Sequence, residues 1–429
     1  MFVTVDPWLN TVGILVGGLD AHIYRDGAFR LLHDQSLYDE PTFLGLLYTY
    51  TPFSAVAFLP TQLIPWRLLT PVWMGLNVAA LFGVVLLSWR LLGYRLSASV
   101  VGSAALLTLS CAFLEPVRTT LYFGQINIML MLLVLWDFSR AERSRLRGIG
   151  VGIAAGIKLV PLYFVLEYAA LRQWRAMATA AGTFVLTVVG TALILPADSR
   201  RYWTSIFFQS GRIAPDEHPS NQSLRGTIAH LAGGPAPMWL WMLVAGLVLA
   251  AGLWLSVALY RRGEKLLAIV LAGLTACAIS PFSWGHHWVW FIPLLVYLVH
   301  RAQRSAWWWA AAACLYLAIA AWPYQYTPTW ISVGTFLLPP YWPGAQLLMN
   351  AYILTYLVVL AALGALVWRG RPRPGTEAAG SATQAAEPDA VAASPARAAA
   401  ADVAPDAAPE PAGRGANAEA GVVGATGPR

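Results

Sequence analysis

An acidic side chain at the end of the first apolar segment is one candidate for chemistry. Asp20 lies in 17-GGLDAHIYRDGAFRLL-32 and is followed by Tyr24 and Arg25. A carboxylate at such a position can take a proton from a bound molecule, and the tyrosine and arginine can help to hold that molecule. Alternatively, Asp20 or Asp26 can form an ion pair with Arg25 at the helix end. The residue types leave both interpretations open.

Two adjacent histidines are a second candidate. His286 and His287 lie in 281-PFSWGHHWVW-290 among tryptophans that include Trp284. Aromatic rings stack on the apolar faces of sugars, and an imidazole can donate to an oxyanion or shuttle a proton. The alternative is that these rings only anchor a helix end. No third ligand accompanies the histidine pair, so we predict no metal site here.

A lysine within an apolar stretch is the third candidate. Lys158 lies in 152-GIAAGIKLVPL-162. An ammonium group in a low-dielectric site attracts a phosphate strongly, and we favour this interpretation. Two simpler alternatives are that the side chain reaches the aqueous edge or pairs with Glu167, nine positions along the chain.

Amide side chains occur in one apolar segment. Gln125 and Asn127 lie in 124-GQINIML-130, inside an expected helix. Interhelical hydrogen bonds and ligand contacts are both consistent with that position.

The longest polar stretch is residues 197–236, which contains 219-PSNQSLRG-226. The amides of Asn221 and Gln222 can bind sugar hydroxyls, and Arg225 can stabilise negative charge on a phosphate. Asn221 also begins a match to a glycosylation sequon.

Composition defines the environment of these residues. The chain has 429 residues, of which 58% are hydrophobic and 11% charged, and its mean hydropathy is +0.58. A soluble domain has about 25% charged residues, so this composition excludes both a soluble globule and a largely disordered chain. The net charge of +7 comes from arginines in short loops between apolar runs, which indicates membrane orientation rather than nucleic-acid binding. The three cysteines have no CxxC spacing, so they predict neither a disulfide framework nor a metal site.

Long apolar stretches predict an all-α polytopic membrane protein. Spanning helices are expected near 72–89, 97–114, 119–138, 176–196, 237–260, 266–283, 305–322 and 346–368, with shorter stretches at 7–18 and 287–300. By the positive-inside rule, the arginine-rich loops and the C-terminus face the cytoplasm. The acidic, histidine and amide candidates then lie at the outer face, over a cavity with Lys158 as its deepest polar group.

Four segments depart from this pattern. Residues 149–171 have basic loops at both ends, which predicts a re-entrant pair of half helices bent near Pro161. In residues 50–71, prolines at 52, 60, 65 and 71 forbid one continuous helix, so the segment is expected to lie along the outer leaflet. The first apolar segment, 2–18, is barely long enough to span. Residues 374–429 have the composition of a disordered tail.

The chain resembles glycosyltransferase family 87, which is part of the GT-C superfamily. Six motifs carry the resemblance, and they occur here in the same order as in that family. They are 20-DAHIYRDGA-28, 50-YTPFSAVAFLP-60, 124-GQINIMLMLL-133, 152-GIAAGIKLVPL-162, 221-NQSLRG-226 and 281-PFSWGHHWVW-290. Enzymes of this superfamily use polyprenol-phosphate sugars. Actinobacterial members of the family include α-(1→2)-mannosyltransferases of phosphatidylinositol mannoside, lipomannan and lipoarabinomannan assembly.

The resemblance implies a GT-C-type bundle of about 10–12 transmembrane helices with a re-entrant pair and outer juxtamembrane helices. The transmembrane domain is expected at residues 1–373, with a first outer loop at 19–71, the re-entrant pair at 149–171 and an outer loop at 197–236. A cytoplasmic tail follows at 374–429.

The resemblance also implies an activity: transfer of mannose with inversion from polyprenyl-phosphate mannose to a hydroxyl of phosphatidylinositol mannoside or a lipoglycan, on the extracytoplasmic side of the plasma membrane. Asp20 corresponds to the base and His286 or His287 to a group near the reacting atoms. The expected substrate-binding residues are Tyr24, Arg25, Gln125, Asn127, Lys158, Asn221, Gln222, Arg225 and Trp284. No cofactor or metal is expected. The alternatives are arabinofuranosyl transfer from decaprenyl phosphate, a transporter or flippase of lipid-linked sugars, and a non-catalytic scaffold.

Overall fold

The computed structural model describes residues 17–209, 212–320, 325–326, 330–331 and 349–369. The predicted first helix lies outside these ranges except for its last two residues, and the predicted tail lies wholly outside them. Within the described ranges the regular structure is helical, apart from two short antiparallel strands, β1 (Gln325–Tyr326) and β2 (Trp330–Ile331). The all-α prediction is confirmed.

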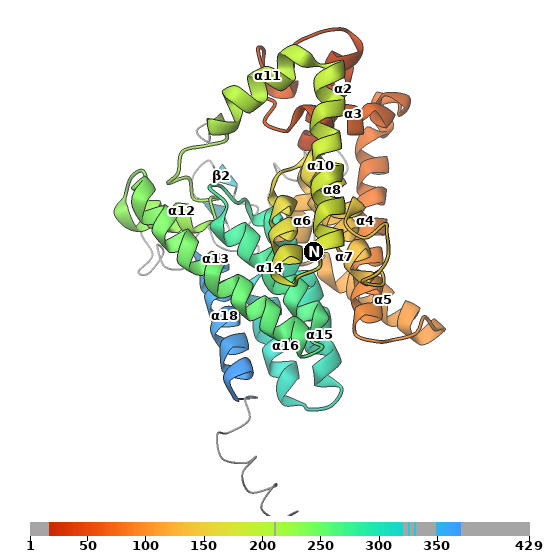
Figure 1. Ribbon diagram of the computed structural model, residues 1–429, viewed down its shortest axis with the longest axis vertical. Coiled ribbons are helices and arrows are strands. Elements are labelled where there is room, and N and C mark those ends of the chain that lie inside the picture. The colour runs from red at the N-terminus through yellow and green to blue at the C-terminus, as the bar shows by residue number, and fades with distance from the viewer. Residues whose placement is uncertain (1–16, 210–211, 321–324, 327–329, 332–348, 370–429) are drawn as a thin grey trace, which may run out of the picture. The chain divides into compact units, whose positions relative to one another are not determined.

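The α-helices follow one another along the chain. They are α2 (Leu19–Leu32), α3 (Pro52–Ala57), α4 (Trp66–Leu91), α5 (Ala98–Cys111), α6 (Glu115–Phe123), α7 (Asn127–Ser139), α8 (Ile149–Ile157), α9 (Tyr163–Ala170), α10 (Trp174–Ile194), α11 (Pro196–Thr204), α12 (Leu224–Ala232), α13 (Met238–Arg261), α14 (Lys265–Ile279), α15 (Phe291–Ala302), α16 (Trp307–Ala318) and α18 (Ala351–Arg369). The longer connections include those from α2 to α3 and from α11 to α12. Short 3-10 turns include η2 (Phe43–Gly45), η3 (Leu59–Leu63), η4 (Val160–Leu162), η5 (Ile206–Phe208) and η7 (Gly285–Trp290). Figure 1 shows their arrangement.

Four described helices are long and apolar enough to cross a membrane, namely α4, α10, α13 and α18, and the bent pair of α6 and α7 makes a fifth if it counts as one span. Shorter apolar helices of 10–17 residues accompany them, among them α5, α14 and α16. The chain is therefore a multi-pass membrane protein. The described part contains four or five of the 10–12 spanning helices that were expected.

The predicted span at 119–138 is wrong as a single helix. The chain breaks at Gly124, and α6 and α7 are bent by 117° relative to each other. Gly124 has a φ of 68°, the left-handed conformation that ends many helices, and a Cβ there would lie 3.0 Å from Cβ of Ala21. The break therefore depends on a glycine that also packs closely against α2.

Residues 149–171 form a helix hairpin against α10. A Cβ on Gly148 would lie 2.8 Å from the amide nitrogen of Ala180, and one on Gly156 would lie 2.5 Å from the hydroxyl of Thr187. Because α8 thus runs parallel to α10, α9 must return to the end at which α10 begins. Both ends of residues 149–171 therefore lie at the same end of α10, as the predicted re-entrant pair requires, and the entry of this hairpin into a membrane stays a prediction. The break lies at Lys158, which has extended backbone angles, rather than at Pro161, since proline is tolerated in the first turn of the next helical segment.

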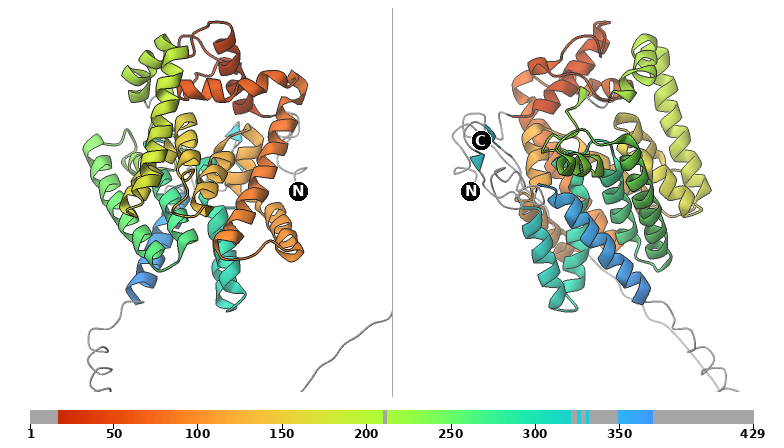
Figure 2. Two further views of the ribbon diagram at one scale, coloured as in Figure 1. Left: turned by 45° about the vertical axis from the view of Figure 1, so that its right-hand side comes forward. Right: turned by 90° about the vertical axis from the view of Figure 1, so that its left-hand side faces the viewer.

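The proline-rich segment at 50–71 is only partly as predicted. Pro52 and Pro60 lie in the first turns of α3 and η3, and Pro65 directly precedes α4. Pro71, however, lies inside α4, which begins at Trp66 instead of near residue 72. The helices α2, α3 and α11 gather at one end of the bundle, as the two further views in Figure 2 also show.

The loops rich in basic residues lie together at one end of the helices. Their side chains meet in pairs: Glu142 with Lys265, Glu264 with Arg301, Tyr94 with His300, Gln173 with Tyr260, and Arg262 with the carbonyl oxygen of Val367. This common location is what their assignment to one side of a membrane requires. The helices α7, α8 and α14 connect this end to the breaks that carry the polar candidates.

Candidate active site

A carboxylate begins a chain of side-chain hydrogen bonds through the site. The hydroxyl of Tyr50 donates to Oδ1 of Asp20 at 3.0 Å. The amide of Gln125 donates to the same hydroxyl at 3.4 Å, and the hydroxyl of Tyr24 donates to Oε1 of Gln125 at 3.1 Å. Three segments that are distant in the sequence thus meet around Asp20.

The same chain continues to a lysine and a histidine. The amide nitrogen of Asn127 lies 3.5 Å from Oε1 of Gln125, and its amide oxygen accepts a hydrogen bond from the Lys158 ammonium at 3.0 Å. The ammonium nitrogen also lies 2.9 Å from Nε2 of His287. The amide of Asn127 further donates to the carbonyl oxygen of His286 at 3.1 Å, which fixes the histidine pair to the start of α7.

Interruptions of helices position these groups. Asp20 is the second residue of α2, Gln125 and Asn127 lie at the break between α6 and α7, Lys158 at the break after α8, and His287 in η7. Helix breaks free backbone polar groups, which need partners in a membrane protein, so polar side chains are tolerated there at the lowest cost.

Exposure differs among these residues. Asp20, Lys158 and His287 are partly exposed, whereas Tyr50, Gln125 and Asn127, which connect them, are buried, as is His286. The three partly exposed side chains are therefore accessible, while their buried neighbours hold them in place.

Burial raises the pKa of the Asp20 carboxyl to about 6. The Gln125 amide, the positive charge of Lys158 and the Tyr50 hydroxyl each favour the ionised form and limit the rise. A carboxyl group with a pKa near 6 is mostly ionised at neutral pH and can still accept a proton, which suits a general base.

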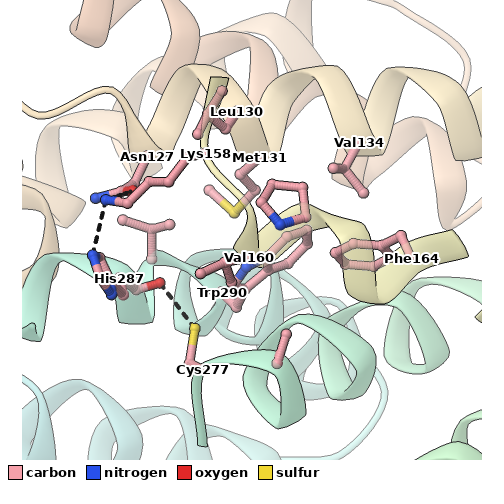
Figure 3. Close-up of a pocket in the computed structure, with 13 residues that line it drawn as sticks. Asn127, Leu130, Met131, Val134, Lys158, Val160, Phe164, Cys277, His287 and Trp290 are labelled. Atoms are coloured by element: carbon pink, nitrogen blue, oxygen red, sulfur yellow. Dashed lines mark hydrogen bonds between the residues drawn. The ribbon is translucent and has the colours of Figure 1, made fainter. Parts of the chain in front are cut away.

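A pocket lies beside the lysine, as Figure 3 shows. Its polar end is formed by Asn127, Lys158 and His287. The rest of the lining is mainly apolar and includes Leu130, Met131, Val134, Val160, Pro161, Phe164 and Trp290. The thiol of Cys277, at the edge of this pocket, donates to the carbonyl oxygen of His287 at 3.2 Å.

Arg25 lies apart from this site. Its guanidinium donates to the carbonyl oxygen of Thr61 at 2.7 Å and to that of Ile64, so it holds η3 against α2. Neighbouring residues on a helix point about 100° apart, which explains why Tyr24 joins the polar network and Arg25 does not. The structure gives Arg25 a role in packing at this place.

The predicted loop residues form a separate cluster. Arg225 makes an ion pair with Asp216 at 2.9 Å. The amide oxygen of Asn221 accepts from the hydroxyl of Ser223 at 2.8 Å, and the amide of Gln222 donates to the carbonyl oxygens of Pro219 and Met349. These side chains therefore brace the loop. The motif alone did not reveal these partners.

Trp284 connects this loop cluster to the histidine pair. Its ring lies 5.5 Å from that of His218 and 6.2 Å from that of His286, with the His286 ring nearly parallel to it. Nε2 of His286 has no hydrogen-bond partner among the described residues. His287, in contrast, contacts Lys158 directly, so the two histidines occupy different environments.

Tyr50 is the residue of the network that sequence reasoning missed. It opens the motif 50-YTPFSAVAFLP-60, but a tyrosine beside a membrane is ordinary, so its position gave no signal.

Groups of three or more histidine, cysteine, aspartate or glutamate residues suited to a metal ion do not occur in the part of the chain that the structure describes.

The amino-acid sequence matches those of known proteins. The model of glycosyltransferase family 87 matches residues 48–281. The polyprenol-phosphate-mannose-dependent alpha-(1-2)-phosphatidylinositol pentamannoside mannosyltransferase of Mycobacterium tuberculosis is 36% identical over 295 residues, 67% of this chain and 67% of that protein. The protein of the same name from Mycolicibacterium smegmatis is 36% identical over 312 residues, 69% of this chain and 75% of its own.

A third relative, also from Mycolicibacterium smegmatis, is a polyprenol-phosphate-mannose-dependent alpha-(1-2)-phosphatidylinositol mannoside mannosyltransferase. It is 29% identical over 329 residues, 71% of this chain and 75% of that protein. No solved structure gives a significant match. The fold and these matches define a multi-pass membrane enzyme that transfers sugars. The chain belongs to glycosyltransferase family 87.

Proposed function

We propose that this enzyme transfers mannose from polyprenyl-phosphate mannose to a hydroxyl of a phosphatidylinositol mannoside and forms an α-(1→2) linkage. The names of the relatives support this donor, acceptor and linkage. The observation that carries the proposal is the continuous set of hydrogen bonds that connects Asp20 to Lys158, because it joins a base and a cation in one site.

Asp20 acts as the general base. The acceptor oxygen attacks the anomeric carbon of mannose while its proton passes to the Asp20 carboxylate. The bond between that carbon and the phosphate oxygen breaks, and its electron pair stays with the polyprenyl phosphate. A β-linked donor then gives an α-linked product by inversion. Polyprenyl phosphate, a phosphate monoester, is a good leaving group, so a second carboxyl group acting as an acid is unnecessary.

Lys158 binds the phosphate of the donor. Its ammonium has three N–H donors, of which two are directed to neutral acceptors on Asn127 and His287. The third donor and the full positive charge are available for the phosphate oxygens. Because negative charge on the phosphate grows as the sugar leaves, a fixed cation stabilises the transition state more than the ground state.

The apolar part of the pocket suits the isoprenoid chain of the donor. Leu130, Val134 and Phe164 line the pocket beyond its polar end. A phosphate at Lys158 would place the first isoprene units among these side chains, where burial of apolar surface contributes about 25 cal/mol per Å².

The site faces the extracytoplasmic side of the plasma membrane in this proposal. The site lies at one end of α7, α8 and α14, and the basic loops lie together at the other end of these helices. Basic loops favour the cytoplasm. We also propose that transfer needs no metal ion, because Lys158 supplies the positive charge at the phosphate.

The test uses the purified full chain in detergent with polyprenyl-phosphate mannose and phosphatidylinositol mannoside. Mass spectrometry should detect a product with one added hexose, and nuclear magnetic resonance should identify an α-(1→2) linkage. Activity should persist in EDTA. A pentose product formed only from decaprenyl-phosphate arabinofuranose would contradict the proposed donor. Lipid movement across sealed vesicles with no new glycolipid in detergent would instead indicate a transporter.

A further inference from the structure

Tyr50 lies close to both charged groups of the site, Asp20 and Lys158. Its hydroxyl donates to Oδ1 of Asp20 at 3.0 Å, and the Lys158 ammonium lies 5.7 Å from the centre of its ring. The rings of Tyr24 and Tyr48 meet the Tyr50 ring edge-on at 4.9 and 5.7 Å. Tyr50 is therefore held between the proposed base and the proposed phosphate-binding cation.

The backbone at Tyr50 is fixed from two directions. The hydroxyl of Tyr38 donates to the carbonyl oxygen of Tyr50 at 2.8 Å. The hydroxyl of the next residue, Thr51, donates to the carbonyl oxygen of Gly156, two residues before Lys158. Residues 50 and 51 thus connect the helix that carries Asp20 to the turn that carries Lys158.

The hydrogen bonds around the Tyr50 hydroxyl have a defined direction. An ionised carboxylate only accepts hydrogen bonds, so the hydroxyl must donate its single proton to Asp20. The Gln125 amide donates to the oxygen of the same hydroxyl. The proton of Tyr50 is therefore committed to the carboxylate, and a hydrogen bond to an ionised group is about twice as strong as one between neutral groups.

We propose that Tyr50 is a positioning residue for the base: its hydroxyl favours the ionised form of Asp20 and occupies Oδ1, which leaves Oδ2 to take the proton of the acceptor hydroxyl. The proton moves from the acceptor oxygen to Oδ2, and Tyr50 keeps its own proton throughout. This inference rests on the proposed function, because it requires Asp20 to act as a base.

Other titratable groups near Asp20 bear on its protonation. Tyr24 on α2 and Lys158 after α8 act on it together with Tyr50. The remaining titratable or charged groups on α2 near Asp20 and on the elements packed nearby are His22 and Arg25 on α2, Arg67 on α4, Glu115, Arg118 and Tyr122 on α6, and His286 and His287 on η7. A change at Tyr50 alone leaves all of these in place.

The test replaces only the hydroxyl, in Tyr50→Phe. Loss of a hydrogen bond to a charged group should move the acid limb of the pH–rate profile upward by about 1–2 pH units. Relative to the wild type at the same pH, the rate of mannose transfer should thus fall about 3- to 25-fold near pH 6.5 and recover towards the wild-type rate near pH 8.5. The matched control is Tyr48→Phe, which removes a buried hydroxyl that bonds to Ser54 at 2.5 Å in the same segment. Its acid limb should match that of the wild type.

A second readout does not depend on turnover. Infrared difference spectra recorded during a pH titration, with Asp20→Asn as the blank, report protonation of the Asp20 carboxyl. Tyr50→Phe should raise its midpoint by the same 1–2 units. An unchanged midpoint, or a loss of rate by one constant factor at every pH, would overturn the role of Tyr50. If the wild type forms no glycolipid while the infrared midpoint still shifts, the proposed function fails and the interaction of Tyr50 with Asp20 stands.

Discussion

The ammonium nitrogen of Lys158 lies 2.9 Å from Nε2 of His287, although the two residues are 129 positions apart in the chain. An ammonium group has only donors, so Nε2 must accept and His287 must carry its proton on Nδ1. A neutral imidazole in this position orients Lys158 without cancelling its charge. The contact therefore connects the hairpin of α8 and α9 to η7 at the polar end of the pocket.

Replacing the lysine should mainly affect use of the donor. In Lys158→Met the charge is lost while the length of the side chain is kept, so kcat/KM for polyprenyl-phosphate mannose should fall by about 10²–10³-fold. Initial rates at varied donor concentration measure this effect. The chain has one other lysine, Lys265, which is about half exposed and lies 3.6 Å from Glu142. Lys265→Met should leave kcat/KM within about twofold of the wild type, as surface ion pairs contribute little. Equal losses in both variants would contradict a specific role of Lys158.

The two adjacent histidines should differ in importance. His287→Ala removes a partner of Lys158 and should lower the transfer rate by about 10–100-fold, the range for a hydrogen bond to a charged group. His286→Ala should have a smaller effect, because that ring packs between Trp284 and Phe123 and makes no hydrogen bond to Lys158 among the described contacts. Rates of the two variants, measured side by side at saturating substrate, test the difference. The reverse order would require a different assignment of the histidines.

The pH dependence of transfer should follow the protonation of Asp20. Only the ionised carboxylate of Asp20 can take the proton of the acceptor hydroxyl. Burial raises the pKa of this carboxyl group to about 6. The rate should therefore rise with pH to a plateau near pH 7, be half of that plateau near pH 6 and fall about tenfold for each pH unit below pH 5. Initial rates between pH 5 and pH 8.5, with recovery of activity checked after return to pH 7.5, would measure the curve. A rate that stays constant down to pH 5 would exclude Asp20 as the titrating base.

Close packing of α8 on α10 should be sensitive to a single methyl group. A Cβ on Gly152 of α8 would lie 2.7 Å from the carbonyl oxygen of Ala180 on α10. Gly152→Ala should therefore push the helices apart and lower the free energy of unfolding by about 1–3 kcal/mol. The measurement is the apparent melting temperature in detergent, followed by tryptophan fluorescence.

Gly182 on α10 provides the control for this prediction, because a Cβ there would meet no atom within 4 Å. Gly182→Ala should leave the melting temperature unchanged or raise it, since alanine favours helix by about 1 kcal/mol. Equal effects of the two substitutions would mean that helix propensity, not packing of α8 on α10, dominates at these positions.

Polar residues in apolar surroundings were the most informative feature of the sequence. Asp20, Asn127, Lys158 and His287 each stood out because a membrane rejects such groups, and the structure brings them into one network. Their convergence could not be derived from the sequence, since it depends on how the helix breaks pack together.

Other features left no such signal. The break at Gly124 was missed because a glycine inside an apolar run is compatible with both a continuous and a broken helix, and only its packing against Ala21 decides. Arg225 looked available for a phosphate, but its ion pair with Asp216 depends on the fold of the loop, which the sequence does not specify.

The most direct test of Asp20 as the general base compares two aspartates of the same segment. Asp20→Asn keeps the shape of the side chain and removes the base. Asp34→Asn makes the same change at an exposed position. The backbone φ of Asp34 is 52°, and asparagine also tolerates this positive value. Single-turnover mixing with pre-bound polyprenyl-phosphate mannose gives the rate of transfer apart from donor binding. Asp20→Asn should slow transfer by at least about 10²-fold and still bind the donor, and Asp34→Asn should match the wild type. Transfer by Asp20→Asn at the wild-type rate would contradict the assignment of the base.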